Sequence, residues 1–240
     1  MVRRADMNGG SYYTLLASLP GQDSLFQAKF TPLSRQAFRK RLTMLSPEDG
    51  ALFTRIADIL AWRRLGPERT EERYRTDVLR LLADIDSETL REIIVERMEV
   101  RSILAAQRRR AAGEAAPSEA ESARLYFGNI TGRIARHWQE PGMGLAGQYP
   151  WVIETDRQIR AGNYYAVEKL VLDWLWRRLP QHLLHHTFDF EAVVIYALRW
   201  DLVERWVRYE PEAAKTQFST LLDHALKTLP EGVFNDQTRH

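Results

Sequence analysis

The sequence predicts an all-α protein, an irregular multi-helix bundle of about eight to ten helices. Apolar residues recur at three- and four-residue spacing along most of the chain, which is the period of an amphipathic helix. Capping residues, glycines and prolines separate these stretches, as expected between helices. No period of about 20 to 50 residues repeats itself, so we do not expect an exact solenoid.

The first half of the chain is expected to consist of helices after a disordered start, residues 1–10. Ser34 can cap one helix, and the run Ser46-Pro47-Glu48-Asp49 opens the next with a hydroxyl cap, a proline and first-turn carboxylates. Gly113 should end the longest helix. The apolar segment at residues 11–26, stopped by Pro20 and Gly21, is too short for its pattern to separate a strand from a helix, and we favour a helix. The other expected helices lie near residues 34–45, 46–64, from 67 and 86–112.

Residues 113–122, GEAAPSEAES, are small and polar and are interrupted by Pro117, so they are the best candidate for a linker. They divide the chain into an N-terminal part, 1–112, and a C-terminal part, 123–240, which could also pack as one domain. The helices expected in the second part lie near residues 123–139, with interruptions at two glycines, 151–160, 163–179, 188–209 and 211–229.

Two charged residues occupy apolar helix faces. Arg199 lies between Ile195 and Val203 on the inward face of residues 188–209, and Glu168 lies within the apolar arc of residues 163–179. A buried charge without a partner costs several kcal/mol, roughly, so each needs a counter-charge or an exit to water. Because both lie about ten residues from the connecting turn, we predict a buried Glu168/Arg199 ion pair between adjacent helices.

The composition bounds the class of protein. Hydrophobic residues make up 45% of the 240 residues, enough for a core, and the net charge of +2 does not describe a polycation. The absence of cysteine excludes disulfides, zinc ribbons and thiol catalysis, and it fits a reducing cytoplasm. No apolar run reaches the roughly 18 to 20 residues that a membrane span needs. We therefore expect a cytoplasmic protein.

The strongest chemical pattern is a group of histidines, His182, His185 and His186, near Asp189 and Glu191. The three imidazoles, at i, i+3 and i+4, could in principle face one metal ion, although a polar turn rich in histidine is the more ordinary interpretation. The glycine-rich residues 141–148 lack the lysine and Ser/Thr of a P-loop. We find no nucleophile or paired-acid pattern, so we predict no enzyme, no catalytic residue, no cofactor and no metal.

Two surface patches could contact a partner. Arginines at the end of the long helix could touch nucleic acid or an anionic membrane face, although such a run is more often a solvated helix end. The chain also has seven tryptophans, and large aromatics and arginines are enriched at protein interfaces, although packing between helices is the commoner use. The candidate partner-surface residues are Trp176, Arg177, Arg178, Arg108, Arg109 and Arg110.

Three stretches carry a family resemblance: YYTLLASLP at residues 12–20, VRSILAAQRRRAAG at 100–113 and FDFEAVVIYALRWDLVERW at 188–206. Together they resemble an uncharacterised bacterial family of small helical proteins encoded beside V-type ATPase genes. The last two are also similar to blocks of the C subunit of V/A-type ATPases, called d in eukaryotes. In this sequence, Arg110 to Gly113 correspond to a helix stop of that subunit, and Val194-Ile195-Tyr196-Ala197 correspond to the aliphatic-Tyr-aliphatic centre of its C-terminal helix.

The resemblance implies an all-helical fold like that of the V-type ATPase C protein, and a role as a non-catalytic subunit or accessory/assembly factor of a V-type ATPase. Its partners would be rotor or stalk proteins, and the chain would be cytoplasmic or peripheral at the inner membrane through the complex. The alternative from another class is a nucleic-acid-associated helical regulatory protein, which a salt-dependent affinity for DNA or RNA would reveal.

Overall fold

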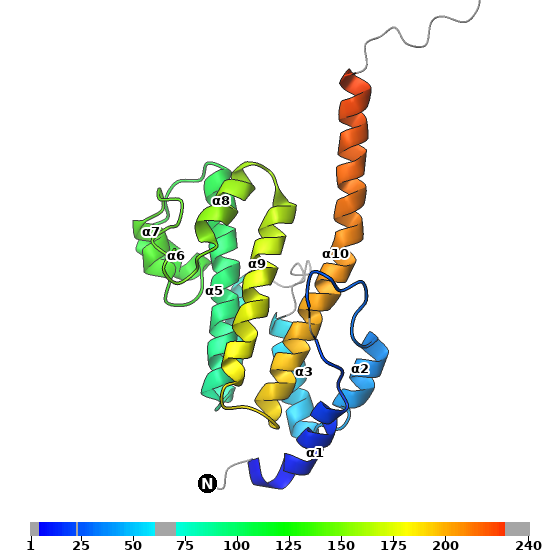
Figure 1. Ribbon diagram of the computed structural model, residues 1–240. Helices are drawn as coiled ribbons and strands as arrows, with labels where there is room; N and C mark the ends of the chain where they lie inside the picture. Colours follow the sequence, from blue (N-terminus) through cyan, green and yellow to red (C-terminus); the bar gives the residue numbers. More distant parts are fainter. Residues whose placement is uncertain (1–4, 23, 61–70, 229–240) are drawn as a thin grey trace, which may run out of the picture.

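The computed structural model describes residues 5–22, 24–60 and 71–228, and in this part of the chain it contains ten α-helices, one 3-10 helix and no strand (Figure 1). The predicted all-α class is confirmed. The elements are α1 (Ala5–Ala17), α2 (Arg35–Leu42), α3 (Pro47–Leu60), α4 (Glu71–Asp84), α5 (Glu88–Ala111), α6 (Glu119–Leu125), α7 (Thr131–Arg136), α8 (Val152–Arg160), α9 (Tyr164–Arg178), η1 (Leu179–Leu183) and α10 (Phe190–Thr228).

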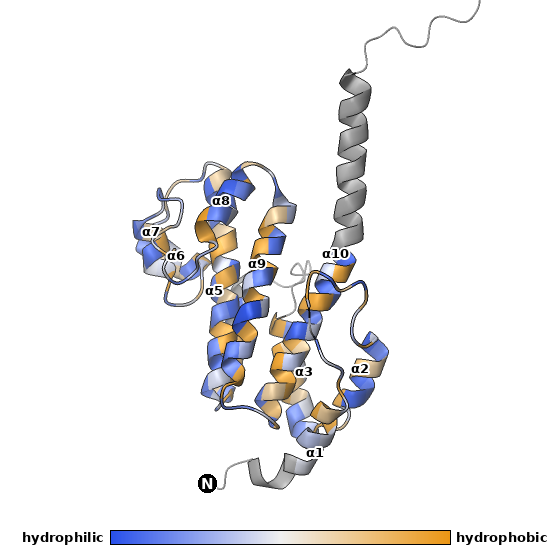
Figure 2. Cartoon of the chain, viewed as in Figure 1, coloured by the Kyte–Doolittle hydropathy of each residue, from blue (hydrophilic) through white to orange (hydrophobic). Residues whose placement is uncertain are grey.

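Three long helices organise the bundle. Figure 1 shows α5, α9 and the first part of α10 running alongside one another, with α6, α7 and α8 at one end and α1, α2 and α3 around α10 at the other. Direct packing joins α8 to both α5 and α9, and joins α10 to α1, α3 and α9. In Figure 2 each long helix carries both hydrophobic and hydrophilic residues, as amphipathic helices around a shared core do.

Local signals place most helix ends where the sequence predicts them. The Ser34 hydroxyl accepts a hydrogen bond from the Ala37 amide at 3.2 Å, and Ser87 caps α5 in the same way. Gly113 ends α5 with φ of +84°, a left-handed conformation that glycine adopts without strain. These contacts involve residues within about five positions of each other, which is why the sequence alone reveals them.

Three expectations about segments differ from the structure. α6 begins inside the predicted linker, because Ser118 and Glu121 form a capping box there. α1 begins at Ala5, within residues expected to be disordered. α10 continues through Pro211, where a new helix was expected, although a proline inside a helix removes one backbone hydrogen bond and is unfavourable there. The expected helix end near residue 64, the start at 67 and the tail after 229 lie outside the described residues.

One hydrophobic cluster draws on both sides of the predicted linker. It includes Leu15 and Ile93 from the N-terminal part and Leu172 and Val203 from the C-terminal part, all essentially inaccessible to water. Four of the tryptophans lie buried between helices, which is the commoner interpretation given above; they are Trp138, Trp151, Trp200 and Trp206. Within the described chain, no helix combines the length and the apolar character that crossing a bilayer requires.

Candidate functional site

Glu168 on α9 pairs with Arg205 on α10. Its two carboxylate oxygens accept hydrogen bonds from Nε and Nη2 of Arg205, the latter at 2.8 Å, in a fork geometry that suits a guanidinium. The predicted helix-to-helix ion pair therefore exists for Glu168, but Arg199 is the wrong partner.

The offset between the two arginines follows from the turn. η1 continues directly from α9, and its five residues advance the chain by about 10 Å at about 2.0 Å per residue. An α-helix covers the same length with six to seven residues at about 1.5 Å each. The position on α10 that lies opposite Glu168 is therefore about six to seven residues farther from the turn. Arg205 lies six positions beyond Arg199.

Arg199 has a different environment. Its guanidinium lies 4.0 Å from the centre of the Trp176 ring, a cation–π contact, and its Nη2 donates a 3.0 Å hydrogen bond to the Gln22 carbonyl. Next to it, the Tyr196 hydroxyl donates to the Pro20 carbonyl at 2.9 Å. Hydrogen bonds thus connect the segment after α1 to α10. Trp176, predicted as part of a partner surface, contacts Arg199 inside this arrangement.

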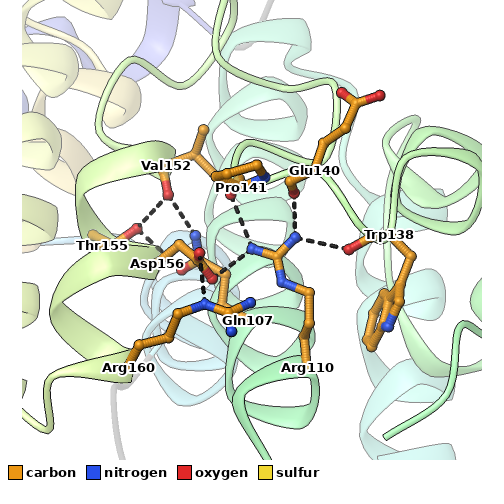
Figure 3. Close-up of polar contacts among 9 residues, drawn as sticks. All are labelled: Gln107, Arg110, Trp138, Glu140, Pro141, Val152, Thr155, Asp156 and Arg160. Carbon is orange, nitrogen blue, oxygen red and sulfur yellow. Dashed lines mark hydrogen bonds and ion pairs between the residues drawn. The ribbon is translucent and has the colours of Figure 1, made fainter. Parts of the chain in front are cut away.

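Arg110 is buried, so its assignment to the predicted partner surface is wrong. Figure 3 shows its guanidinium among the backbone carbonyls of residues 138–141, donating to Trp138 at 2.8 Å, to Pro141 at 3.0 Å and also to Glu140. Its Nη2 lies 2.5 Å from the Asp156 carboxylate, and both side chains are 5% exposed. Arg110 is an anchor for this segment, because its charge satisfies carbonyls that no helix ladder can satisfy.

The same cluster joins α5 to α8. Asp156 also receives the Arg160 Nε at 3.1 Å, and Gln107 donates to the Val152 carbonyl at 2.6 Å and accepts from the Thr155 hydroxyl at 3.0 Å (Figure 3). The glycine-rich residues 141–148 therefore form a packed corner whose apolar side chains, Met143 and Leu145, are fully buried.

The other predicted surface arginines divide into two groups. Arg108 and Arg177 are exposed, although Arg177 also pairs with Asp173 one turn away on α9. Arg109 binds Glu114 at 2.7 Å, and Arg178 binds Glu96 on α5 at 2.7 Å. The structure therefore does not bring the six predicted residues together on one surface.

Glu99 is a second buried anchor that the sequence patterns did not reveal. Its carboxylate accepts the Asn129 amide at 2.8 Å and the Tyr149 hydroxyl, and burial together with this hydrogen bond raises the pKa of the Tyr149 phenol. Gly128 has φ of +87°, and a Cβ there would lie 2.3 Å from the Glu99 side chain. The available sequence signal was Glu99 itself, an acidic residue between the apolar residues Met98 and Val100.

Arg97 on α5 and Asp201 on α10 carry opposite charges, and each affects the pKa of the other. Burial lowers the pKa of Arg97 to about 10, opposed by the charge of Asp201. Burial likewise raises the pKa of Asp201, opposed mainly by Arg97. The two shifts have the same origin, since each group loses water and is partly compensated by the other.

The histidines do not converge on one point. His182 lies between Glu92 and Glu96 of α5, with its ring nitrogens 3.7 and 3.4 Å from the two carboxylates. His185 is exposed, and His186 contacts Thr89 and Asp189. The three-imidazole grouping considered from the sequence is therefore wrong.

An apolar surface lies where α1 meets the turn before α10. Leu184 is 81% exposed, and the half-exposed rings of Tyr13 and Phe188 contact each other with centroids 4.9 Å apart. We call these three residues the apolar end. Exposed apolar side chains that contact each other, as the rings of Tyr13 and Phe188 do, mark interaction sites more often than isolated ones do.

Comparison of the chain with family models, with curated proteins and with solved structures finds no match in any of the three.

Proposed function

We propose that this chain is a non-catalytic subunit or accessory factor of a bacterial V-type ion-translocating ATPase, and that it acts by docking onto rotor or stalk proteins. The observation that carries the proposal is the apolar end, Tyr13, Leu184 and Phe188, which exposes large apolar side chains on a helical protein. The protein needs no turnover of its own for this role.

The stretches behind the family resemblance support the same surface. Residues 12–20 pack against the start of α10, through the Tyr13–Phe188 ring contact and the hydrogen bond from Tyr196 to Pro20. Two of the three stretches that resemble the ATPase-associated family thus contribute Tyr13 and Phe188 to the apolar end, and Leu184 lies just before the second of them. A shared docking surface would give both stretches a common role.

The interior polar contacts support a mechanical role. Arg110 with Asp156 connects α5 to α8, and Glu168 with Arg205 connects α9 to α10. Cross-links of this kind resist sliding of one helix along another. A coupling protein needs that resistance, because it transmits force through helix packing.

The terminal part of α10 offers a second contact in this proposal. The helix continues beyond Tyr209, whose ring stacks on Tyr165 of α9, as far as Thr228. In that part the sequence places Phe218, Leu221, Leu222 and Leu226 at helical spacing. Such a pattern is typical of a helix that inserts into a groove of a partner.

A pull-down from the native host tests the proposal. Tagged full-length chain should capture the catalytic and rotor proteins of the ATPase, identified by mass spectrometry, and Leu184→Asp with Phe188→Asp should abolish the capture. Ile153→Asp is the matched control, since Ile153 is 51% exposed on α8, at the other end of the bundle (Figure 1).

Two results would contradict it. Capture of no ATPase component by the wild-type chain would remove the proposed partner, and equal capture by the Leu184 and Phe188 variant would remove the apolar end as the docking surface. The nucleic-acid alternative draws little support from the described arginines, because Arg109, Arg110 and Arg178 are bound to carboxylates.

A further inference from the structure

Three side chains of different chemistry converge just before and within the first turn of α10. One ring nitrogen of His186 and one carboxylate oxygen each from Asp189 and Glu191 lie within 4.8 Å of one another. All three residues are partly buried, so water and ions can reach them. The histidine group noted from the sequence therefore contributes one imidazole here, with two carboxylates in place of the other two.

The imidazole of His186 is held from both sides. Its Nδ1 lies 2.6 Å from Oδ2 of Asp189, and its Nε2 lies 2.9 Å from the Thr89 hydroxyl on α5. In the tautomer whose Nε2–H donates to Thr89, the Nδ1 lone pair faces the Asp189 carboxylate. In the other tautomer, Nδ1–H donates to Asp189 and Nε2 accepts from Thr89, which satisfies the same two contacts without an ion. Binding of a metal ion at Nδ1 would therefore select the first tautomer and replace the hydrogen bond to Asp189.

Asp189 is also oriented for a ligand. Its Oδ1 accepts the Ala192 amide of α10 at 3.0 Å, which leaves Oδ2 directed at His186. Metal-binding histidines and carboxylates generally have their second polar atom held in this manner, which fixes their orientation. Thr89 and the Ala192 amide would provide that support here.

The geometry points to a binding site for one divalent transition-metal ion, with Nδ1 of His186, Oδ2 of Asp189 and a carboxylate oxygen of Glu191 as its three protein ligands. Water would complete the coordination, and Nδ1 would bind the ion through its lone pair while Nε2–H donates to Thr89. The mixed imidazole and carboxylate set favours ions such as Zn²⁺ or Co²⁺ over Mg²⁺, which prefers oxygen ligands alone.

Charge also favours a cation at this position. The start of a helix carries about half a positive elementary charge, which opposes cation binding. The two carboxylates contribute two full negative charges, so the sum remains attractive to a divalent ion. Binding would join α5, the turn and α10 at one point.

Titration of metal-free full-length protein with Co²⁺, followed by its visible absorption, and equilibrium dialysis with Zn²⁺ test this inference. We expect one ion per chain for the wild type and loss of that binding in His186→Ala. Thr89→Val should weaken binding by roughly 10- to 100-fold, because it removes only the support of the ring. His185→Ala is the matched control, since this neighbouring imidazole is exposed and outside the cluster; it should bind as the wild type does.

Asp189→Asn separates loss of the metal ligand from loss of the fold, because the amide oxygen can still cap α10 while the negative charge is removed. Far-ultraviolet circular dichroism should match the wild type, and Co²⁺ binding should be lost. Absence of one-to-one binding in the wild type, or unchanged binding in His186→Ala, overturns the site. The docking proposal is separate, because the Leu184 and Phe188 variant should retain Co²⁺ binding whether or not it captures the ATPase.

Discussion

Arg110 and Arg205 make similar bonds in two different environments. Arg110, 5% exposed, faces the backbone of residues 138–141 and the equally buried Asp156, whereas Arg205, 24% exposed, forms a fork with Glu168 beside solvent. Water can replace the partner at Arg205 and cannot do so at Arg110. The lesson is that burial of both partners, more than the number of bonds, decides how much an arginine contributes to stability.

The largest expected effect is at the buried corner. Arg110→Ala should lower the free energy of unfolding by about 3 to 5 kcal/mol, because it leaves the buried Asp156 with only the exposed Arg160 as counter-charge and removes the donor to three carbonyls. Urea denaturation measures the change. Arg108→Ala, two positions earlier and exposed, should stay within about 0.5 kcal/mol of the wild type. Equal losses of unfolding free energy in both variants would contradict the conclusion that burial decides the contribution of Arg110.

The next effect tests the Glu99 anchor in the same end of the bundle. Gly128→Ala should destabilise by about 2 to 4 kcal/mol, because a positive φ and a clash with the held Glu99 side chain each cost about 1 to 2 kcal/mol. Gly132→Ala, with its nearest atom 3.8 Å away, is the control and should be neutral or stabilising in thermal unfolding. A neutral Gly128→Ala would mean that Glu99 can move aside easily.

A double-mutant cycle sharpens the comparison at the partly exposed pair of Glu168 and Arg205. Glu168→Ala with Arg205→Ala should show a coupling of about 1 kcal/mol, as partly screened ion pairs do. Glu168→Ala with Arg199→Ala should be additive within about 0.5 kcal/mol, since Arg199 contacts Trp176 instead. The reverse result would restore the partner predicted from the sequence.

The smallest expected effect concerns acid pH. Burial opposes ionisation of Glu96, but hydrogen bonds from His182 and Arg178 outweigh it and lower the pKa of this carboxyl. A lowered acid pKa in the folded state adds stability above about pH 4.5, and that stability is lost as the pH falls through the folded value.

Glu96→Gln should therefore lose less stability than the wild type between about pH 5 and pH 3, as measured by urea unfolding at each pH. Glu92→Gln removes a carboxylate that is 62% exposed one turn away, and it should retain the wild-type slope. A wild-type slope in Glu96→Gln would show that its bonds to His182 and Arg178 do not persist in solution.

The fold class was predictable because its signals are short-range. Ser34, Ser87 and Gly113 act on backbone groups a few residues away, so their effect can be read without a structure. The capping box of Ser118 and Glu121 was equally legible and was missed, because the composition of residues 113–122 suggested a linker.

The candidate sites were less predictable because their partners are far apart in sequence. Glu168 was correctly recognised as a charge within an apolar face, yet its partner depended on the length of η1. Arg110 looked like a solvated helix end, and nothing local indicates that residues 138–141 fold over it. His186 lies 97 positions from Thr89, the residue that orients its ring.

By itself, the sequence determined that this chain is helical, roughly where most helices begin and end, and which faces are apolar, because these properties depend on hydrogen bonds and spacing within a few turns. Only the tertiary structure decided which carboxylate each arginine meets, which tryptophans are covered and which imidazole has two acidic neighbours. The physical reason is that a charge inside a bundle pairs according to the axial offset and rotation of whole helices, and those are set by packing across the entire core.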